Sequence, residues 1–112
     1  MSTRDLSFGN SSGARSGAPE QAVLIYLVGA VDQDDLTTLE NELSDAIAEE
    51  ALGEYDGHEF GPDGARLFMY SPDAESLYAG IEATLRDHPL CRNARVIVRL
   101  GQPGAPERQI RI

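Results

Sequence analysis

The chain has 112 residues and a formal net charge of −10, from 19 acidic side chains and nine basic ones. All nine basic residues are arginine. This length builds a single domain, and 41% apolar with 25% charged residues is ordinary for a globular protein. The composition argues against a membrane-spanning protein, which needs about 18 consecutive apolar residues, and against a disulfide scaffold or a fibre. It also argues against nucleic-acid binding, which usually needs a basic surface.

The first 19 residues predict a disordered tail, and residues 20–112 predict one domain. The tail contains five serines, three glycines and few large apolar side chains. Such a segment buries too little apolar surface to offset the entropy lost on ordering it. It lacks the apolar run of a secretory signal, and Cys91 is the only cysteine. We therefore expect a cytoplasmic protein in which Cys91 packs as a small apolar side chain.

The negative charge is concentrated in residues 20–65. That segment holds thirteen acidic residues and no basic one, whereas residues 66–112 hold seven arginines and five acids. We therefore expect a bipolar surface, with its acidic pole on the first helix and the first hairpin. An acidic pole favours a basic protein partner over a nucleic acid or an anionic membrane.

A buried strand and an amphipathic helix are expected at the start of the domain. Residues 22–28 form a continuous, β-branched apolar run, as central strands do. Asp32 is a good helix N-cap, with acidic residues in the turn that follows. Gly53 is a plausible end of this helix. The apolar stripe of the helix comprises Leu36, Leu39, Leu43, Ile47 and Ala51.

A hairpin is expected next. Residues 54–60 are polar and glycine-rich, which predicts an edge strand that could carry a bulge. Residues 61–64 read Gly-Pro-Asp-Gly, a tight turn. The apolar residues 66–70 predict a second core strand that pairs with the edge strand.

A second helix and two more strands complete the pattern. Ser71 and Pro72 predict a helix start, with serine as the N-cap and proline at the first helical position, and Pro89 ends that helix. Its apolar stripe comprises Ala74, Leu77, Tyr78, Ile81 and Leu85. Residues 94–100 alternate as a fourth strand, and residues 107–112 could form a short fifth strand hairpinned to it.

The β-α-β-β-α-β order predicts an α+β fold. The simplest arrangement is a ferredoxin-like two-layer sandwich, which could carry an extra C-terminal strand. Its strand order, 4-1-3-2, places the apolar strands 22–28 and 66–70 in the centre and the polar segment 54–60 at an edge. Hydrophobicity and position therefore agree, which supports this fold.

Two stretches resemble a small family of uncharacterised bacterial proteins of similar length. They are residues 53–61, GEYDGHEFG, and residues 67–74, LFMYSPDA. The resemblance covers residues 21–112 and implies a domain of that size, but no activity. Ferredoxin-like domains include enzymes, ligand-binding domains, RNA binders and dimerisation modules, so this fold does not decide the function.

The densest group of chemically versatile side chains lies around the first hairpin: Tyr55, Asp56, His58, Glu59 and Asp63. In a regular strand Asp56 and His58 share one face and Glu59 takes the other. The first two could therefore act as an acid–base pair or as part of a metal site. A charged edge strand that discourages edge pairing explains the same residues more simply. No complete ligand set, phosphate-binding motif or nucleophile–base set accompanies them, so we predict no catalytic residue, metal or cofactor.

Two functions fit the sequence. The first is a non-catalytic module that binds a basic protein partner, such as an immunity or antitoxin-like protein or an assembly factor. The second is a regulatory domain that binds a small ligand or metal through residues 55–63. The basic segment 92–111 of one chain could also meet the acidic segment 32–63 of another. Pairing through the C-terminal edge would then give a homodimer.

Overall fold

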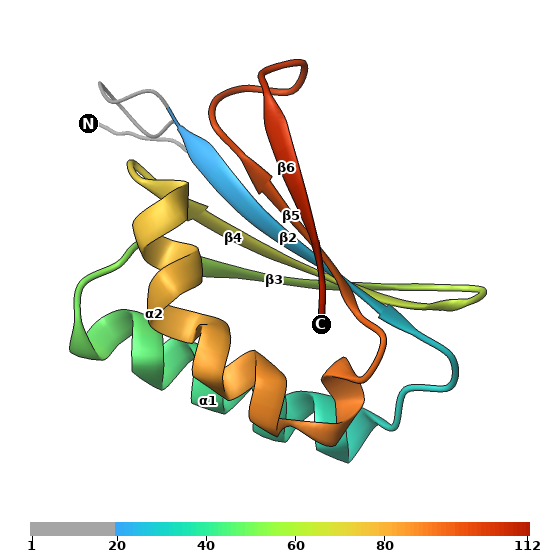
Figure 1. Cartoon of the computed structure of the whole chain (residues 1–112). Helices are drawn as coiled ribbons and strands as arrows, with labels where there is room; N and C mark the ends of the chain where they lie inside the picture. Colours follow the sequence, from blue (N-terminus) through green and yellow to red (C-terminus); the bar gives the residue numbers. More distant parts are fainter. Residues whose placement is uncertain (1–19) are drawn as a thin grey trace, which may run out of the picture.

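The computed structural model describes residues 20–112, and the predicted tail lies outside this range. Five strands form one antiparallel sheet, and both helices lie against the same face of it (Figure 1). The strands are β2 (Gln21–Val28), β3 (Glu54–Gly61), β4 (Gly64–Ser71), β5 (Arg95–Arg99) and β6 (Glu107–Arg111). The helices are α1 (Gln33–Glu49), α2 (Ala74–Asp87) and the short 3-10 helix η1 (Pro89–Cys91).

The sheet order is β3-β4-β2-β5-β6, so β2 lies in the middle and β3 and β6 form the edges. The predicted α+β class is confirmed, and the arrangement is compatible with a ferredoxin-like sandwich. The order differs from a four-stranded sheet because β6 extends it beyond β5. β6 pairs with β5 from Arg99↔Glu107 to Arg95↔Arg111, which confirms the fifth strand.

The core lies between the sheet and the two helices. Alternate residues of β2 are buried against the helices, and Val23 and Ile25 are fully inaccessible. The predicted helix stripes are confirmed, apart from Ala51, which lies beyond the end of α1 and is exposed. The large helix side chains that are fully buried are Leu36, Leu39, Leu43, Leu77, Ile81 and Leu85. Each contributes about 1.5–3 kcal/mol through removal of apolar surface from water.

The helix end predicted at Gly53 is wrong. α1 ends at Glu49, and Ala51 takes the left-handed conformation beyond it, with φ of 52°. Gly53 lies just before β3, where a Cβ atom would sit 2.3 Å from the backbone oxygen of Tyr70. Gly53 is therefore required for the close approach of two chain segments and not for capping the helix.

The helix start predicted at Ser71 and Pro72 is also wrong. Asp73 is the N-cap of α2, and its Oδ1 accepts a hydrogen bond from the Ser76 backbone N–H at 3.2 Å. Ser71 is the last residue of β4 instead. Its buried hydroxyl donates to the backbone oxygen of Leu52 at 2.7 Å, which ties the strand to the α1–β3 connection.

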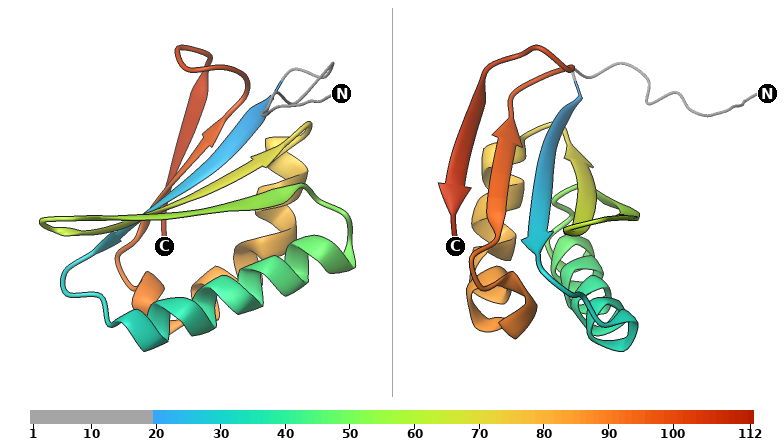
Figure 2. Two further views of the ribbon diagram at one scale, coloured as in Figure 1. Left: turned by 180° about the vertical axis from the view of Figure 1, so that it is seen from behind. Right: turned by 90° about the vertical axis from the view of Figure 1, so that its right-hand side faces the viewer.

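The second face of the sheet carries no described helix (Figure 2). Tyr26 of β2 and Phe68 of β4 are partly exposed on this face. The Arg95 guanidinium carbon lies 4.6 Å from the centre of the Tyr26 ring, and that of Arg66 lies 5.8 Å from the centre of the Phe68 ring. The helix-free face therefore combines aromatic and basic groups. Within residues 20–112, no helix is long and apolar enough to cross a membrane.

Candidate functional site

A bulge in β3 determines which of its side chains lie together. The pairing with β4 shifts between Tyr55 and Gly57, so Asp56 is the extra residue of the bulge. Residues three apart in a regular strand face opposite sides of the sheet. Because Asp56 is the extra residue, Tyr55 and His58 face the same side. The prediction that Asp56 and His58 share a face assumed a regular strand, and β3 is not regular at this point.

Tyr55 and His58 both face α1, where they meet the carboxylate of Glu40. The Tyr55 hydroxyl donates to Glu40 Oε2 at 2.5 Å. His58 Nδ1 lies 2.7 Å from the same oxygen, and its ring contacts the ring of Phe60 edge-on at 5.2 Å between centroids. The Glu40 side chain is 18% exposed and that of His58 is 27% exposed, so the cluster is only partly open to solvent.

This arrangement orients the imidazole, with Nδ1 towards the Glu40 carboxylate. A carboxylate at Nδ1 favours the tautomer that carries its proton there, which leaves Nε2 as an acceptor or ligand. His58 could thus accept a proton or bind one polar group of a ligand. In the described part of the chain, no three histidine, cysteine or acidic side chains are grouped so that they could hold a metal ion.

Partial burial, together with the hydrogen bond to Glu40, raises the pKa of Tyr55 well above its ordinary value of about 10. An ionised phenolate would lie beside the Glu40 carboxylate in a partly desolvated position. The folded state therefore holds Tyr55 neutral at pH values where the unfolded chain loses this proton.

Replacing Tyr55 with phenylalanine should remove part of the alkaline pH dependence of stability. The folded-state pKa is raised, so the contribution of Tyr55 is complete below about pH 10 and is lost as the pH rises towards that raised value. In the wild type the free energy of unfolding should fall by up to about 1.4 kcal/mol more per pH unit than in Y55F. Urea unfolding at pH 9, 10 and 11 measures the difference, and equal slopes would contradict it. Because the chain has no lysine, no lysine side chain titrates in this pH range.

Two of the other predicted site residues lie away from this cluster. Glu59 lies on the helix-free face and forms an ion pair with Arg66. Asp63 lies in the hairpin turn, where its backbone oxygen accepts a hydrogen bond from the Gly29 N–H at 2.8 Å. Asp56 is exposed at the bulge, and its charge contributes to the raised pKa of Tyr55. Of the five predicted residues, Tyr55 and His58 are the two that contact Glu40.

Sequence reasoning did not identify Glu40. The sequence pattern that could have pointed to Glu40 is its position on α1. It lies next to Leu39 and one turn from Leu36 and Leu43, so its carboxylate flanks the apolar stripe. Cys91 behaves as predicted. It is fully buried, and burial followed by the charge of Glu42 raises the pKa of its thiol to about 11. A thiol in that state is a poor nucleophile.

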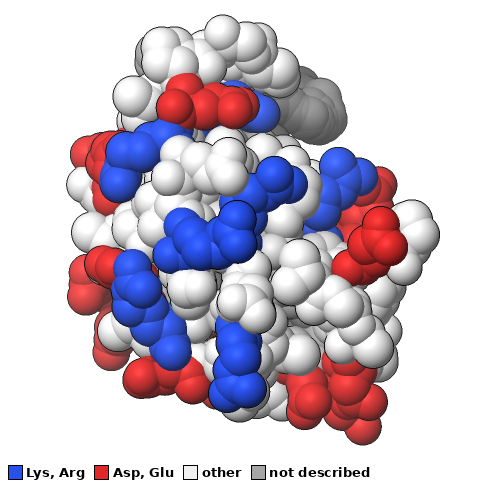
Figure 3. Space-filling view, turned by 45° about the vertical axis from the view of Figure 1, so that its right-hand side comes forward, with Lys and Arg blue, Asp and Glu red and all other residues white. Residues whose placement is uncertain are grey.

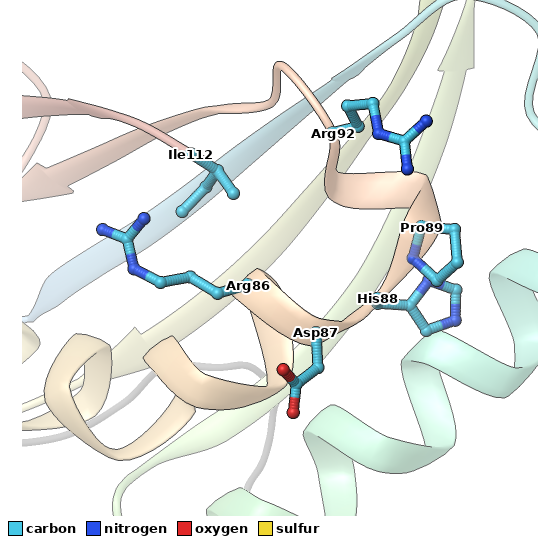
Figure 4. Close-up of a pocket in the computed structure, with 6 residues that line it drawn as sticks. All are labelled: Arg86, Asp87, His88, Pro89, Arg92 and Ile112. Atoms are coloured by element: carbon cyan, nitrogen blue, oxygen red, sulfur yellow. The ribbon is translucent and has the colours of Figure 1, made fainter.

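Two hollows in the surface of residues 20–112 lie away from the cluster. One of about 320 Å³ lies where α2 meets η1, and Figure 4 shows its charged side chains diverging, with Arg86 beside Ile112 and Arg92 on the far side. Another, of about 290 Å³, lies beside the β3–β4 turn and includes Asp63 and Arg95. Neither has the convergent polar groups of a ligand site.

No known protein family, curated protein or solved structure matches the chain. The resemblance based on residues 53–61 and 67–74 therefore stays a prediction.

Proposed function

We propose that the chain is a ferredoxin-like, non-catalytic interaction module of the cytoplasm that binds a basic protein partner. The proposed contact surface is the outward face of α1. An immunity or antitoxin-like protein or an assembly factor would use such a surface to recognise its partner.

The outward face of α1 carries a line of acidic side chains. Asp35, Glu42 and Glu49 are spaced seven residues apart, so they lie along one side of the helix, and Asp45 lies next to them. All four are exposed. At a rise of about 1.5 Å per residue the line is about 21 Å long, which matches a basic helix or strand of ordinary length.

No arginine of residues 20–112 neutralises this line. Within that range, the arginine–carboxylate pairs are Arg66–Glu59, Arg86–Glu82 and Arg108–Glu75, and none involves α1. The last turn of α1 contains no basic residue, although Glu49 lies there and Glu50 caps the helix. Negative charge at the C-terminal end of a helix is unfavourable by about 0.3–1 kcal/mol for each group. A basic partner would remove this cost, and this observation carries the proposal.

The charges on another face of the molecule restrict where a basic partner can bind. Basic side chains gather across the middle of the face in Figure 3, with acidic ones mostly around its border. A basic partner would be repelled from that region and attracted to the acidic line on α1. Complementary charge of this kind mainly raises the rate of association and the specificity of binding.

Neutralising the acidic line should abolish capture of the partner. The test variant carries Glu42→Gln, Asp45→Asn and Glu49→Gln, and the matched control carries Asp63→Asn, Glu82→Gln and Asp87→Asn, which removes the same charge elsewhere. A partner captured from cell extract by the wild type and the control should bind the test variant at least about tenfold more weakly. Binding should also fall steeply from about 50 mM to about 300 mM salt. If no protein distinguishes the two variants, the proposal is wrong.

A second candidate function is favoured by the hydrogen-bonded imidazole. His58, held by Glu40 beside Tyr55, could bind one polar group of a small ligand and make the chain a regulatory domain. A metabolite that raises the melting temperature of the wild type but not of H58A would favour this function.

A further inference from the structure

β6 is an edge strand with neither a bulge nor a proline, although it carries charged side chains. Edge strands are commonly guarded by bulges, prolines, charged side chains or a covering element, because their unpaired backbone groups can capture another strand. The other edge strand, β3, carries the bulge at Asp56 and packs against α1. β6 pairs with β5 without a register shift and contains no proline or lysine. In the described structure, no other strand pairs with its outer side (Figure 1).

The hydrogen bonds to β5 show which backbone groups point outward. Ile112 N–H donates to the backbone oxygen of Ala94 at 3.0 Å, and Leu100 N–H donates to that of Pro106 at 3.0 Å. Hydrogen-bonded positions alternate along an antiparallel pair, so the even-numbered residues of this segment bond to β5. The N–H and C=O groups of Glu107, Gln109 and Arg111 therefore point towards the open edge.

The side chains of β6 leave unbalanced charge at this edge. Arg111 lies directly opposite Arg95 in the sheet, and like charges at facing positions destabilise a strand pair. Within residues 20–112, neither Arg111 nor Glu107 forms an ion pair. Both are exposed on the helix-free face. Arg111 thus faces a like charge within its own sheet, whereas Glu107 faces Arg99.

We propose that two copies of the chain pair through β6, antiparallel and about a twofold axis at Gln109. In this register Gln109 faces its counterpart, and Glu107 of each copy faces Arg111 of the other. Each facing pair exchanges both of its backbone hydrogen bonds. Both Arg111 side chains gain a carboxylate, and the two sheets become one continuous sheet. The interface is isologous, so it closes at the dimer.

Charge and geometry together select this register. A shift that faces Glu107 with its own copy, or Arg111 with its own copy, would bring like charges together. If one strand moved by a single residue along the other, the outward N–H and C=O groups of one copy would face residues of the second copy whose backbone groups already bond to β5. Only the register centred on Gln109 pairs all three outward residues and opposite charges at once. Stacking of the helix-free faces would instead set arginine against arginine.

Charge reversal and rescue test the dimer directly. At about 0.15 M salt the Debye length of about 8 Å screens the repulsion between two acidic copies but leaves contact pairs largely intact. Sedimentation equilibrium from about 10 µM to about 1 mM should show a weak wild-type dimer, as expected for a small interface. E107R and R111E should each weaken it by about tenfold or more, because each creates two like-charge pairs. The double variant E107R/R111E should restore it.

A backbone variant and hydrogen exchange provide a second readout. Gln109→Pro removes an outward N–H that does not bond to β5, so Q109P should keep the fold, checked by circular dichroism, and remain monomeric. The amides of Glu107, Gln109 and Arg111 should gain protection as the wild-type concentration rises. A monomeric wild type, a double variant no tighter than the single variants, or protection independent of concentration would each overturn the proposal. The last result would mean that the edge is covered within one chain.

Dimerisation through β6 does not involve α1. Loss of partner binding in the α1 variant and loss of the dimer in the β6 variants can therefore be told apart.

Discussion

Replacing Gly64 with alanine should destabilise the domain by about 3 kcal/mol or more. Gly64 begins β4 with φ of 152° and faces Val28 at the end of the central strand β2. A Cβ atom at this position would lie 1.9 Å from the backbone oxygen of Leu27. Neither atom can move away alone, so the β2–β4 pairing or the hairpin turn must open. Urea unfolding followed by circular dichroism measures the loss.

Gly57 provides the matched control for this substitution. Its φ is also positive, at 128°, but a Cβ there would have no atom within 4 Å. G57A should therefore show only the strain of an unfavourable backbone conformation, about 1–2 kcal/mol. If G64A and G57A lose the same stability, backbone conformation alone explains both, and the close approach to Leu27 does not matter.

Truncation of Leu43 to alanine should cost about 2.7–5.0 kcal/mol. Leu43 is fully buried in the middle of the α1 stripe, between the helix and the sheet. Its removal loses apolar burial and leaves a cavity that the surrounding side chains only partly fill. Domains of this size have about 5–15 kcal/mol of stability in total, so L43A should shift the urea midpoint strongly.

Ser44 is the neighbouring control position on the same helix. It is exposed, and S44A should change the free energy of unfolding by no more than about 0.5 kcal/mol. A loss in L43A no larger than that in S44A would mean that α1 does not pack against the sheet as described.

The sequence predicted the elements well because their signals are local. Apolar spacing located the buried faces of α1 and α2, and the Gly-Pro-Asp-Gly turn located the β3–β4 hairpin. The end of α1 and the start of α2 were misplaced for different reasons. Ser71 and Asp73 are both suitable N-caps, but in the fold Ser71 ends β4 and donates to Leu52, so Asp73 is the cap. Glycine is required at position 53 because another strand approaches closely there, and no local sequence pattern indicates such an approach.

The candidate site was only partly predictable. Tyr55 and His58 were singled out by residue type, but their common face depends on a bulge whose position the sequence did not specify. Glu40 is fifteen residues from Tyr55 in the chain, and their contact requires α1 to lie across β3 in the folded domain. Long-range contacts of this kind follow from the packing of two elements, which single-sequence patterns do not report.

The bulge at Asp56 has a consequence for variation in chain length. Two residues separate Tyr55 from His58, and the two side chains share a face because one of the intervening residues is bulged. With one residue between them, a regular strand would give the same result, since alternate residues share a face. A homologue one residue shorter here could keep the same tyrosine, histidine and glutamate contacts without a bulge. A gap in an alignment at this point would therefore not indicate that the cluster has been lost.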